Sequence, residues 1–261
     1  MINVEYGGRL GNNLFQYCFG RILASELGYK LQASRINGFS STGDTVDGKI
    51  ISGNPHELHG HEVDLNEILK NPPNGPIHLK GYYQRYEYYK KYKAQIKQWL
   101  QIEEYNVNQK DEDVILHMRL GDDITTFDPN APYIMPFEYY EKALEKLDFN
   151  QLFICSEPET LHSPYIKQFE RYNPLIVGGD TLTDFRVMRS FKNIIVSQST
   201  FSWWGAFLSE ATNVFMPVPQ KGNSRLPNEW SDARPDIDLN VDDESRYTYI
   251  TQENEGWVIN E

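Results

Sequence analysis

The sequence predicts an α/β protein in which parallel strands alternate with helices. Between residues 114 and 217, short apolar runs alternate with segments of helical periodicity. Such alternation is typical of a parallel sheet covered by helices on both faces. The composition agrees, because 39% of the 261 residues are hydrophobic and 24% are charged, as in folded globular proteins. This length accommodates one large domain or two smaller ones.

The first half of the chain predicts a less regular α/β region. Residues 31–75 are rich in Gly, Ser, Asn and Pro, so we expect mostly loops there. The other elements expected, in order, are a strand at 2–5, a glycine-rich turn at 7–11, a helix at 13–27 closed by Gly28, a strand at 76–80, and a helix that follows the tyrosine-rich segment 81–92 and ends near residue 101.

The second half alternates more sharply and predicts a Rossmann-type sheet. We expect strands at 114–120, 151–156, 175–178, 193–198 and 213–217, and helices at 136–147, 158–170, 182–191 and 200–210. The polar segment 104–111 is the expected linker, so the chain divides into domains at 1–108 and 109–261. The acidic segment 228–246 is interpreted as a solvated tail.

Charge and apolar patterning exclude several classes of protein. The formal net charge of −12 argues against binding nucleic acid along an open surface. No apolar run is long enough to span a bilayer, no signal peptide is apparent, and no basic amphipathic helix marks peripheral membrane contact, although such contact stays open. Cys18 and Cys155 have apolar neighbours and are expected to be buried free thiols, which favours a reducing cytoplasm.

Residues 197–208 read SQSTFSWWGAFL and place hydroxyl groups where a strand gives way to a helix. Ser199 and Thr200 lie at the predicted helix start, where hydroxyls and unpaired N–H groups can bind an anion. Ligands of open α/β sheets bind at this carboxyl end of the strands. The alternative is that Ser199 or Thr200 merely caps the helix.

The segment HMRLGD, residues 117–122, ends a strongly apolar strand. Alternation puts His117 and Arg119 on one face, and a planar guanidinium suits a diphosphate because it donates two hydrogen bonds at once. The alternative is an ion pair between Arg119 and Asp122 with His117 as a satisfied core histidine.

Two weaker patterns occur in the first half. GGRLGNN, residues 7–13, lacks the G-x-G-x-x-G spacing of a dinucleotide fingerprint, yet it places Arg9 and Asn12 in a turn that can approach a ligand. A tight structural turn is the alternative. His56, His59 and His61 invite a metal hypothesis, but no fourth ligand is evident, so no metal site is predicted.

These segments together resemble the α-1,2-fucosyltransferase family. The resemblance runs in order through most of the chain, and STFSWWGA at 199–206 is its most specific part. The segments that carry it are GGRLGNNLFQY at 7–17, GYYQRYEYY at 81–89, HMRLGD at 117–122, TDFRVMRSFKNIIVSQSTFSWWGAFL at 183–208, and PNEW at 227–230.

The resemblance implies a GT-B architecture, with two Rossmann-like domains facing each other across a cleft. The domain at 109–261 would bind the donor GDP-fucose, and the domain at 1–108 would supply much of the surface for a galactose-containing acceptor glycan. It also implies an inverting, metal-independent reaction without a further cofactor, so arginine and helix-terminus donors would hold the diphosphate.

The resemblance assigns roles to individual positions. Arg119 would hold the departing diphosphate, and His117 would touch the ribose or phosphate. Ser199 and Thr200 would bind phosphate oxygens, and Phe201 would pack near the base or ribose. Asp184 would read the guanine edge, its alternative being a carboxylate favoured by the helix dipole. Arg9 and Asn12 would line the cleft where fucose and acceptor meet, and Asp122, with Asp123 and Asp128 as alternatives, would be the catalytic base.

One position departs from the family pattern. The family's second arginine is Leu120 here, and alternation points this side chain away from His117 and Arg119, toward packing. Two rival interpretations remain: the same scaffold using another GDP-sugar, such as GDP-rhamnose or GDP-mannose, and a carbohydrate-binding relative without catalysis. The joint presence of His117 and Arg119 with the hydroxyls at the predicted helix start argues against the second.

Overall fold

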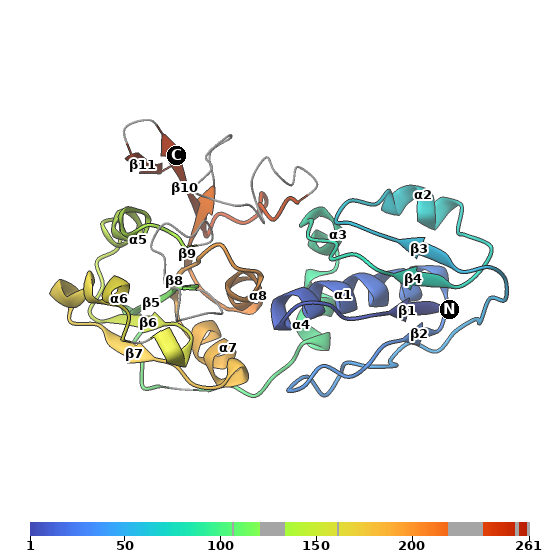
Figure 1. Ribbon diagram of the computed structural model, residues 1–261, viewed down its shortest axis with the longest axis horizontal. Coiled ribbons are helices and arrows are strands. Elements are labelled where there is room, and N and C mark those ends of the chain that lie inside the picture. Colours follow the sequence, from blue (N-terminus) through green and yellow to red (C-terminus); the bar gives the residue numbers. More distant parts are fainter. Residues whose placement is uncertain (106, 121–133, 161, 219–236, 254–255, 260–261) are drawn as a thin grey trace. The chain divides into compact units, whose positions relative to one another are not determined.

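The computed structural model describes residues 1–105, 107–120, 134–160, 162–218, 237–253 and 256–259. The chain forms two compact units (Figure 1). Unit 1 comprises Met1–Ile102 and Asp236–Asn240, and unit 2 comprises Glu103–Pro235 and Val241–Glu261. Each unit contains its own parallel sheet, so the predicted α/β class with Rossmann-like parallel strands is confirmed.

Unit 1 is built on a four-stranded parallel sheet in the order β2-β1-β4-β3. Its elements are β1 (Ile2–Val4), α1 (Leu10–Leu27), β2 (Leu31–Gln32), β3 (His56–Leu58), α2 (Leu65–Lys70), β4 (Ile77–Leu79), α3 (Glu87–Lys90) and α4 (Lys93–Trp99). Two strands and a helix therefore lie within 31–75, where mostly loops were expected. Asp64 explains one of them, because its side chain accepts a hydrogen bond from Glu67 N at 2.8 Å and caps α2.

Helix α1 packs closely on the sheet of unit 1. A Cβ atom at Gly20 would lie 2.5 Å from Val4 Cγ2, so only glycine allows this approach. The helix ends at Gly28 as predicted, with φ of 64° and its N–H bonded to the carbonyl of Ala24. Its start differs from the prediction: α1 begins at Leu10, three residues early, because the glycine-rich turn is short.

Unit 2 contains a seven-stranded sheet in the order β11-β10-β9-β8-β5-β6-β7 (Figure 1). All neighbours are parallel except β10 and β11. The strands are β5 (Val114–His117), β6 (Leu152–Cys155), β7 (Leu175–Val177), β8 (Asn193–Ile195), β9 (Asn213–Val218), β10 (Tyr247–Glu253) and β11 (Gly256–Ile259). The first five match the predicted strands, and the last two were not predicted.

Four α-helices lie in the described part of unit 2: α5 (Phe137–Leu144), α6 (Pro164–Lys167), α7 (Thr181–Arg189) and α8 (Thr200–Leu208). The single helix expected at 158–170 is instead a 3₁₀ turn at Pro158–Thr160, the short α6, and a second 3₁₀ turn at Glu170–Tyr172. Pro164 explains the break, because its ring restricts Ser163 to an extended conformation, from which Ser163 caps α6.

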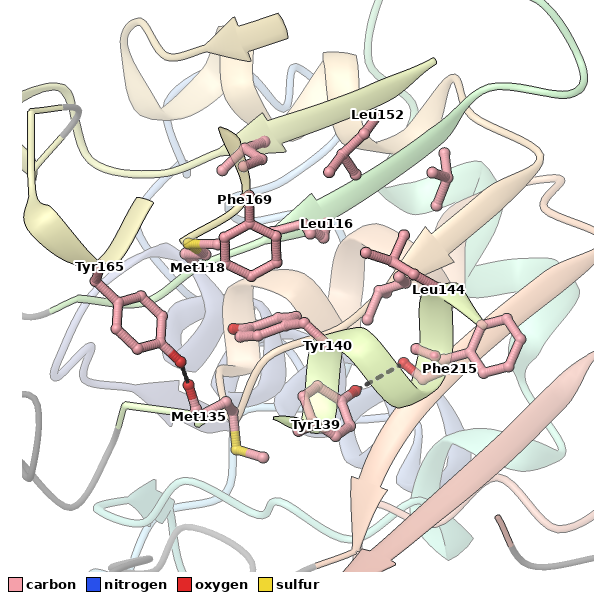
Figure 2. Packing of buried hydrophobic residues seen from close by; sticks show 14 of the residues in the cluster. Leu116, Met118, Met135, Tyr139, Tyr140, Leu144, Leu152, Tyr165, Phe169 and Phe215 are labelled. Atoms are coloured by element: carbon pink, nitrogen blue, oxygen red, sulfur yellow. Dashed lines mark hydrogen bonds between the residues drawn. The ribbon is translucent and has the colours of Figure 1, made fainter. Parts of the chain in front are cut away.

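The two faces of β5 have different surroundings. Leu116, Met118 and Leu120 enter a buried apolar cluster with α5 and the segment around α6 (Figure 2). Leu120 is 4% exposed in that cluster, so this position serves packing, as its alternation with Arg119 predicted. His117 is buried on the opposite face, next to α8.

The described end of the acidic segment is not a solvated tail. Ile237, Leu239 and Val241 are buried, at 8%, 3% and 2% exposure. Asp238 pairs by its backbone with the rest of unit 1, where its N–H donates to the carbonyl of Gln84 at 3.0 Å. Apolar residues at every second position bury one side of this extended segment while its carboxylates stay in water.

Candidate functional site

The chain reverses its direction across the unit 2 sheet between β5 and β8. From β5 it moves through β6 to β7, and it then returns to β8 on the other side of β5. At such a switch point the loops after the two central strands separate and leave room for a ligand beyond their carboxyl ends. His117 ends β5, and residues 196–199 follow β8, so these residues lie at the switch point.

A buried hydrogen bond links the two central strands there. His117 Nδ1 lies 2.7 Å from Ser197 Oγ, and the two residues are 7% and 0% exposed. Ser197 Oγ in turn lies 3.4 Å from Ser202 Oγ in the first turn of α8. The pairing fixes the imidazole plane and thereby the direction in which Nε2 faces. Ser197 was not predicted from the sequence, although its place after a buried strand was an available signal.

Aromatic contacts connect this histidine to α7 and α8. The ring centroids of His117 and Phe201 are 5.2 Å apart, and those of Phe201 and Phe185 are 5.5 Å apart. Phe201 is half-buried, whereas Phe185 is fully buried. The structure thus brings the predicted residues His117 and Phe201 together and leaves part of the Phe201 ring accessible for stacking.

The helix α8 starts where the sequence predicted a helix start and an anion site, with Ser199 and Thr200 at its first positions. Ser199 is the N-cap residue, but its side chain makes no capping hydrogen bond. The simple capping alternative is therefore absent for Ser199, and its hydroxyl remains available for a ligand. Beside it, Gln198 is 1% exposed and neither of its amide atoms has a hydrogen-bond partner, which is unusual for a buried amide. Thr200 is the first residue of α8.

Asp184 lies in the first half of α7 and is 8% exposed. The cap of this helix is Asp180, whose carboxylate accepts from the N–H groups of Leu182 and Thr183. Asp184 Oδ1 accepts instead from Gly179 N at 2.8 Å. Burial raises the pKa of Asp184 to about 6, and the N–H of Gly179 opposes part of that rise.

This pKa makes stability depend on pH. Because the folded-state pKa of Asp184 is about 6, above the ordinary 3.8, the folded protein binds this proton more tightly than the unfolded chain. Its contribution to stability is therefore present near pH 4 and is lost as pH rises through 6. Wild-type protein should therefore lose unfolding free energy between pH 4 and pH 7, and we expect this loss to be smaller in Asp184→Asn, by up to about 3 kcal/mol. Urea unfolding of both proteins at pH 4 and pH 7 measures it; identical pH dependences would contradict the expectation.

Arg119 follows β5 and is half-buried. The peptide groups on either side of it contact the end of β6: Ser156 Oγ donates to the carbonyl of Met118 at 3.0 Å, and Leu120 N donates weakly to Glu157 Oε2 at 3.5 Å. Asp122, with the alternative bases Asp123 and Asp128 and the segment 227–230, lies outside the described residues.

Arg9 and Asn12 belong to unit 1. Arg9 is the exposed N-cap residue of α1, and Asn12 lies in the first turn of that helix and not in a turn before it. Asn12 Oδ1 accepts from Gln84 Nε2 at 3.0 Å, and Gln84 is 2% exposed with no partner for Oε1. Gly8 has φ of 74°, and a Cβ there would lie 2.3 Å from Asn12 Nδ2. Gln84 was missed from the sequence, although it stands in the motif GYYQRYEYY.

The three neighbouring histidines of unit 1 do not share one environment that could form a metal site. His61 is buried, whereas His56 and His59 are exposed, and His59 pairs with Glu57 at 3.1 Å. Throughout the described ranges, no group of three or more His, Cys, Asp or Glu side chains is arranged to hold a metal ion. Cys18 and Cys155 are buried free thiols, and burial raises the pKa of both. No helix among the described residues is long and apolar enough to cross a membrane.

Comparison with known proteins agrees with this geometry. The family model described as Glycosyl transferase family 11 matches residues 56–234, more than two thirds of the 261 residues. The O-antigen biosynthesis glycosyltransferase WbnK of Escherichia coli is 29% identical over 125 residues. That match covers 42% of this chain and 40% of the length of WbnK. The family match includes both central strands of the switch point and the helix start that follows, and the chain belongs to glycosyl transferase family 11.

Proposed function

We propose that this protein transfers L-fucose from GDP-fucose to a hydroxyl group of an acceptor glycan, the 2-hydroxyl of a galactose. The observation that carries the proposal is the gathering of His117, Phe201 and the start of α8, where Ser199 makes no capping bond, at the switch point of the unit 2 sheet. Family membership supports glycosyl transfer, and the resemblance described above supports the fucosyl donor and the linkage.

The donor diphosphate is assigned to the switch point. A guanidinium from Arg119 supplies a planar pair of donors, and the hydroxyls of Ser199 and Thr200 with the N–H groups of the first turn of α8 supply the rest. His117 donates from the ring nitrogen that does not face Ser197. Of these groups, His117 is held by its hydrogen bond to Ser197 before GDP-fucose binds, and such preorganisation is what makes hydrogen-bond donors effective in catalysis.

The base of the nucleotide is assigned to the α7 side. The carboxylate of Asp184 accepts from N1–H and the amino group of guanine, and Phe201 packs against the base or ribose. Desolvation has raised the pKa of Asp184 to about 6, so two donors from guanine would stabilise its ionised form.

The reaction is a single displacement at the anomeric carbon. The acceptor oxygen forms a bond to that carbon while the bond to the diphosphate oxygen breaks, and GDP leaves with the electron pair. A carboxylate base, for which Asp122 is proposed, takes the hydroxyl proton. Negative charge grows on the departing diphosphate, so Arg119 and the α8 donors bind the transition state more tightly than the ground state.

The two units are proposed to form a GT-B arrangement. Unit 2 would hold the donor, and Arg9 and Asn12 in unit 1 would meet the acceptor or the fucose. WbnK is named for O-antigen biosynthesis, which supports an acceptor of the surface-polysaccharide class. A cytoplasmic site of action is proposed from the two buried free thiols. Such acceptors are built at membranes, so peripheral membrane contact belongs to the same proposal.

No metal is assigned to the reaction, because the proposed diphosphate ligands are protein donors. We expect full activity in about 5–10 mM chelator, enough to strip Mg²⁺, whose protein sites rely on carboxylates and substrate phosphates. Turnover measured with and without EDTA, followed by Mg²⁺ or Mn²⁺ addition, checks this. A loss of activity that the added metal restores would contradict it.

The second candidate is a different GDP-sugar donor, such as GDP-rhamnose or GDP-mannose, and its motive is that Leu120 stands where the family pattern has a second arginine. Leu120 lies in the apolar cluster and not toward the proposed donor site, so its location does not favour this candidate over GDP-fucose. Competition between GDP-sugars for the same enzyme distinguishes the candidates.

The decisive experiment follows release of GDP. Purified protein, GDP-fucose and chelator are incubated with and without galactose-terminated acceptors. Release that depends on the acceptor supports both the reaction and the donor, and analysis of the product gives the linkage. Without any release, calorimetric binding of GDP would shift the assignment to another sugar or acceptor, whereas absence of GDP binding would contradict the phosphate site itself.

A further inference from the structure

Side chains from other elements hold the backbone where β5 ends. Regular pairing of β5 stops at His117, and the chain continues through Met118 to Arg119. The Tyr140 hydroxyl donates to the carbonyl of His117 and the Ser156 hydroxyl donates to the carbonyl of Met118, each at 3.0 Å. Tyr140 and Ser156 are each 1% exposed, so these bonds are shielded from water.

Ser156 itself is oriented by a second hydroxyl. Its Oγ lies 2.7 Å from Thr160 Oγ1, and Thr160 is 3% exposed. Thr160 Oγ1 also donates to the carbonyl of Glu157 at 2.7 Å, and this carbonyl accepts from Thr160 N as well. Either hydroxyl can be the donor in the contact between Ser156 and Thr160, and when Thr160 donates there the Ser156 proton is left for the carbonyl of Met118.

Ser156 has one hydroxyl proton and three acceptors within reach: the carbonyl of Met118 at 3.0 Å, Thr160 Oγ1 at 2.7 Å and Glu157 Oε2 at 3.4 Å. Donation by Thr160 to Ser156 favours the bond from Ser156 to Met118. The same turn carries Glu157, whose carboxylate accepts from Leu120 N at 3.5 Å. Contacts from the end of β6 thus fall on both sides of Arg119, at the carbonyl before it and at the N–H after it.

We propose that Ser156, oriented by Thr160, is a positioning residue that fixes the peptide carrying Arg119 in the orientation required for the departing diphosphate. The inference rests on the proposed function, since it assumes that Arg119 meets the phosphates. Ser156 follows β6, which pairs with β5 on the side opposite to β8, and its hydrogen bond to this segment is to a backbone carbonyl. It is thus distinct from the residues that touch the donor.

The expected kinetic signature follows from when the phosphate charge develops. A guanidinium displaced by a fraction of an ångström still attracts the ground-state diphosphate but fits the transition state less well. We expect Ser156→Ala to lower kcat about 10-fold while the KM for GDP-fucose changes less than about 3-fold. Thr160→Val should lower kcat by a smaller factor, and Thr160→Ser should restore it.

Ser209→Ala is the matched control. Ser209 is 2% exposed, and its hydroxyl donates to the carbonyl of Ala206 at 2.7 Å, at the end of α8 opposite to Ser199. The same hydroxyl accepts from Ala211 N at 3.2 Å and from Arg246 Nη1 at 3.3 Å, so its removal costs buried hydrogen bonds at the end of α8 farther from Ser199. We expect its kcat to stay within about 2-fold of wild type at a comparable loss of thermal stability.

A second measurement tests the inference without any substrate. Amide hydrogen exchange is measured for the peptide covering residues 118–120, and we expect faster exchange in Ser156→Ala than in wild type or Ser209→Ala. Unchanged exchange, wild-type kcat in Ser156→Ala, or an equal kcat loss in Ser209→Ala would each overturn the inference. A wild-type protein that shows no turnover contradicts the proposed function instead, and the exchange arm then still decides whether Ser156 holds this peptide.

Discussion

Replacement of Arg119 by alanine is expected to lower kcat/KM for glycosyl transfer about 10³-fold, which corresponds to about 4 kcal/mol of transition-state stabilisation. The proposed role of this guanidinium is to meet charge that develops on the departing diphosphate. The next residue is the buried Leu120, so the position after Arg119 supplies no second cation. The measurement is acceptor-dependent GDP release, with circular dichroism to show that the fold is retained.

Arg171→Ala is the control for this variant. Arg171 is an exposed arginine of the same unit that pairs with Glu141 and packs beside Phe137. Exposed ion pairs contribute little, so its loss should leave both activity and stability nearly unchanged. Near-normal turnover in Arg119→Ala would contradict the assignment of the diphosphate to the end of β5.

The second large effect is expected on stability, from replacement of Arg246 by methionine. The side chain of Arg246 is 14% exposed and its Nε donates to Glu244 at 2.7 Å. Its other nitrogens donate to carbonyls at the C-terminal end of α8, those of Ala206, Phe207, Ser209 and Ala211. Loss of Arg246 removes a charge-assisted bond from each of these carbonyls, of which that of Ala206 keeps other donors, the N–H and hydroxyl of Ser209. We therefore expect the free energy of unfolding to fall by about 3 kcal/mol.

Thermal unfolding of Arg246→Met tests this, with an expected decrease in Tm of about 6–10 °C. Lys192→Met is the control, because Lys192 Nζ also donates to a carbonyl near this helix end, that of Glu210 at 3.2 Å, but from an exposed position. The control should change Tm by less than about 2 °C. Equal shifts in both variants would show that Arg246 does not hold the end of α8.

The sequence predicted the elements whose pattern is local. The apolar strand at 114–120 and the helix at 200–210 were found because burial on both sheet faces and helical periodicity leave continuous signals. Strands β10 and β11 were missed, because their polar and apolar residues follow no strong alternation and they depend on β9 for pairing. Ile237, Leu239 and Val241 did alternate, but the carboxylates among them suggested a solvated segment.

The sequence indicates candidate site residues one at a time but does not predict the distances between them. His117 and Phe201 were identified separately, and only the strand order places β5 beside β8. The hydrogen-bond partner of His117 is Ser197, 80 residues away in the sequence. Local sequence patterns do not predict contacts between residues that are so far apart in the chain. The hydroxyl pair of Ser156 and Thr160 was also not predicted, because Ser and Thr are common in turns and their presence there does not indicate a specific contact.

The assignment of Asp236–Asn240 to unit 1 has a consequence for biosynthesis. This short segment supplies the backbone hydrogen-bond partner of Gln84 and Tyr86. The segment must therefore be synthesised before unit 1 can form all of its backbone hydrogen bonds. Unit 2 in turn awaits β10, which pairs with β9 only after that segment has emerged. Unit 1 is complete only after Asn240 has been made, and unit 2 only after β10 has followed, so a chain truncated after Ile102 would lack part of unit 1. Nascent chains arrested before and after the segment Asp236–Asn240 should therefore differ in the protease resistance of unit 1, and only chains that extend past Glu253 should protect unit 2.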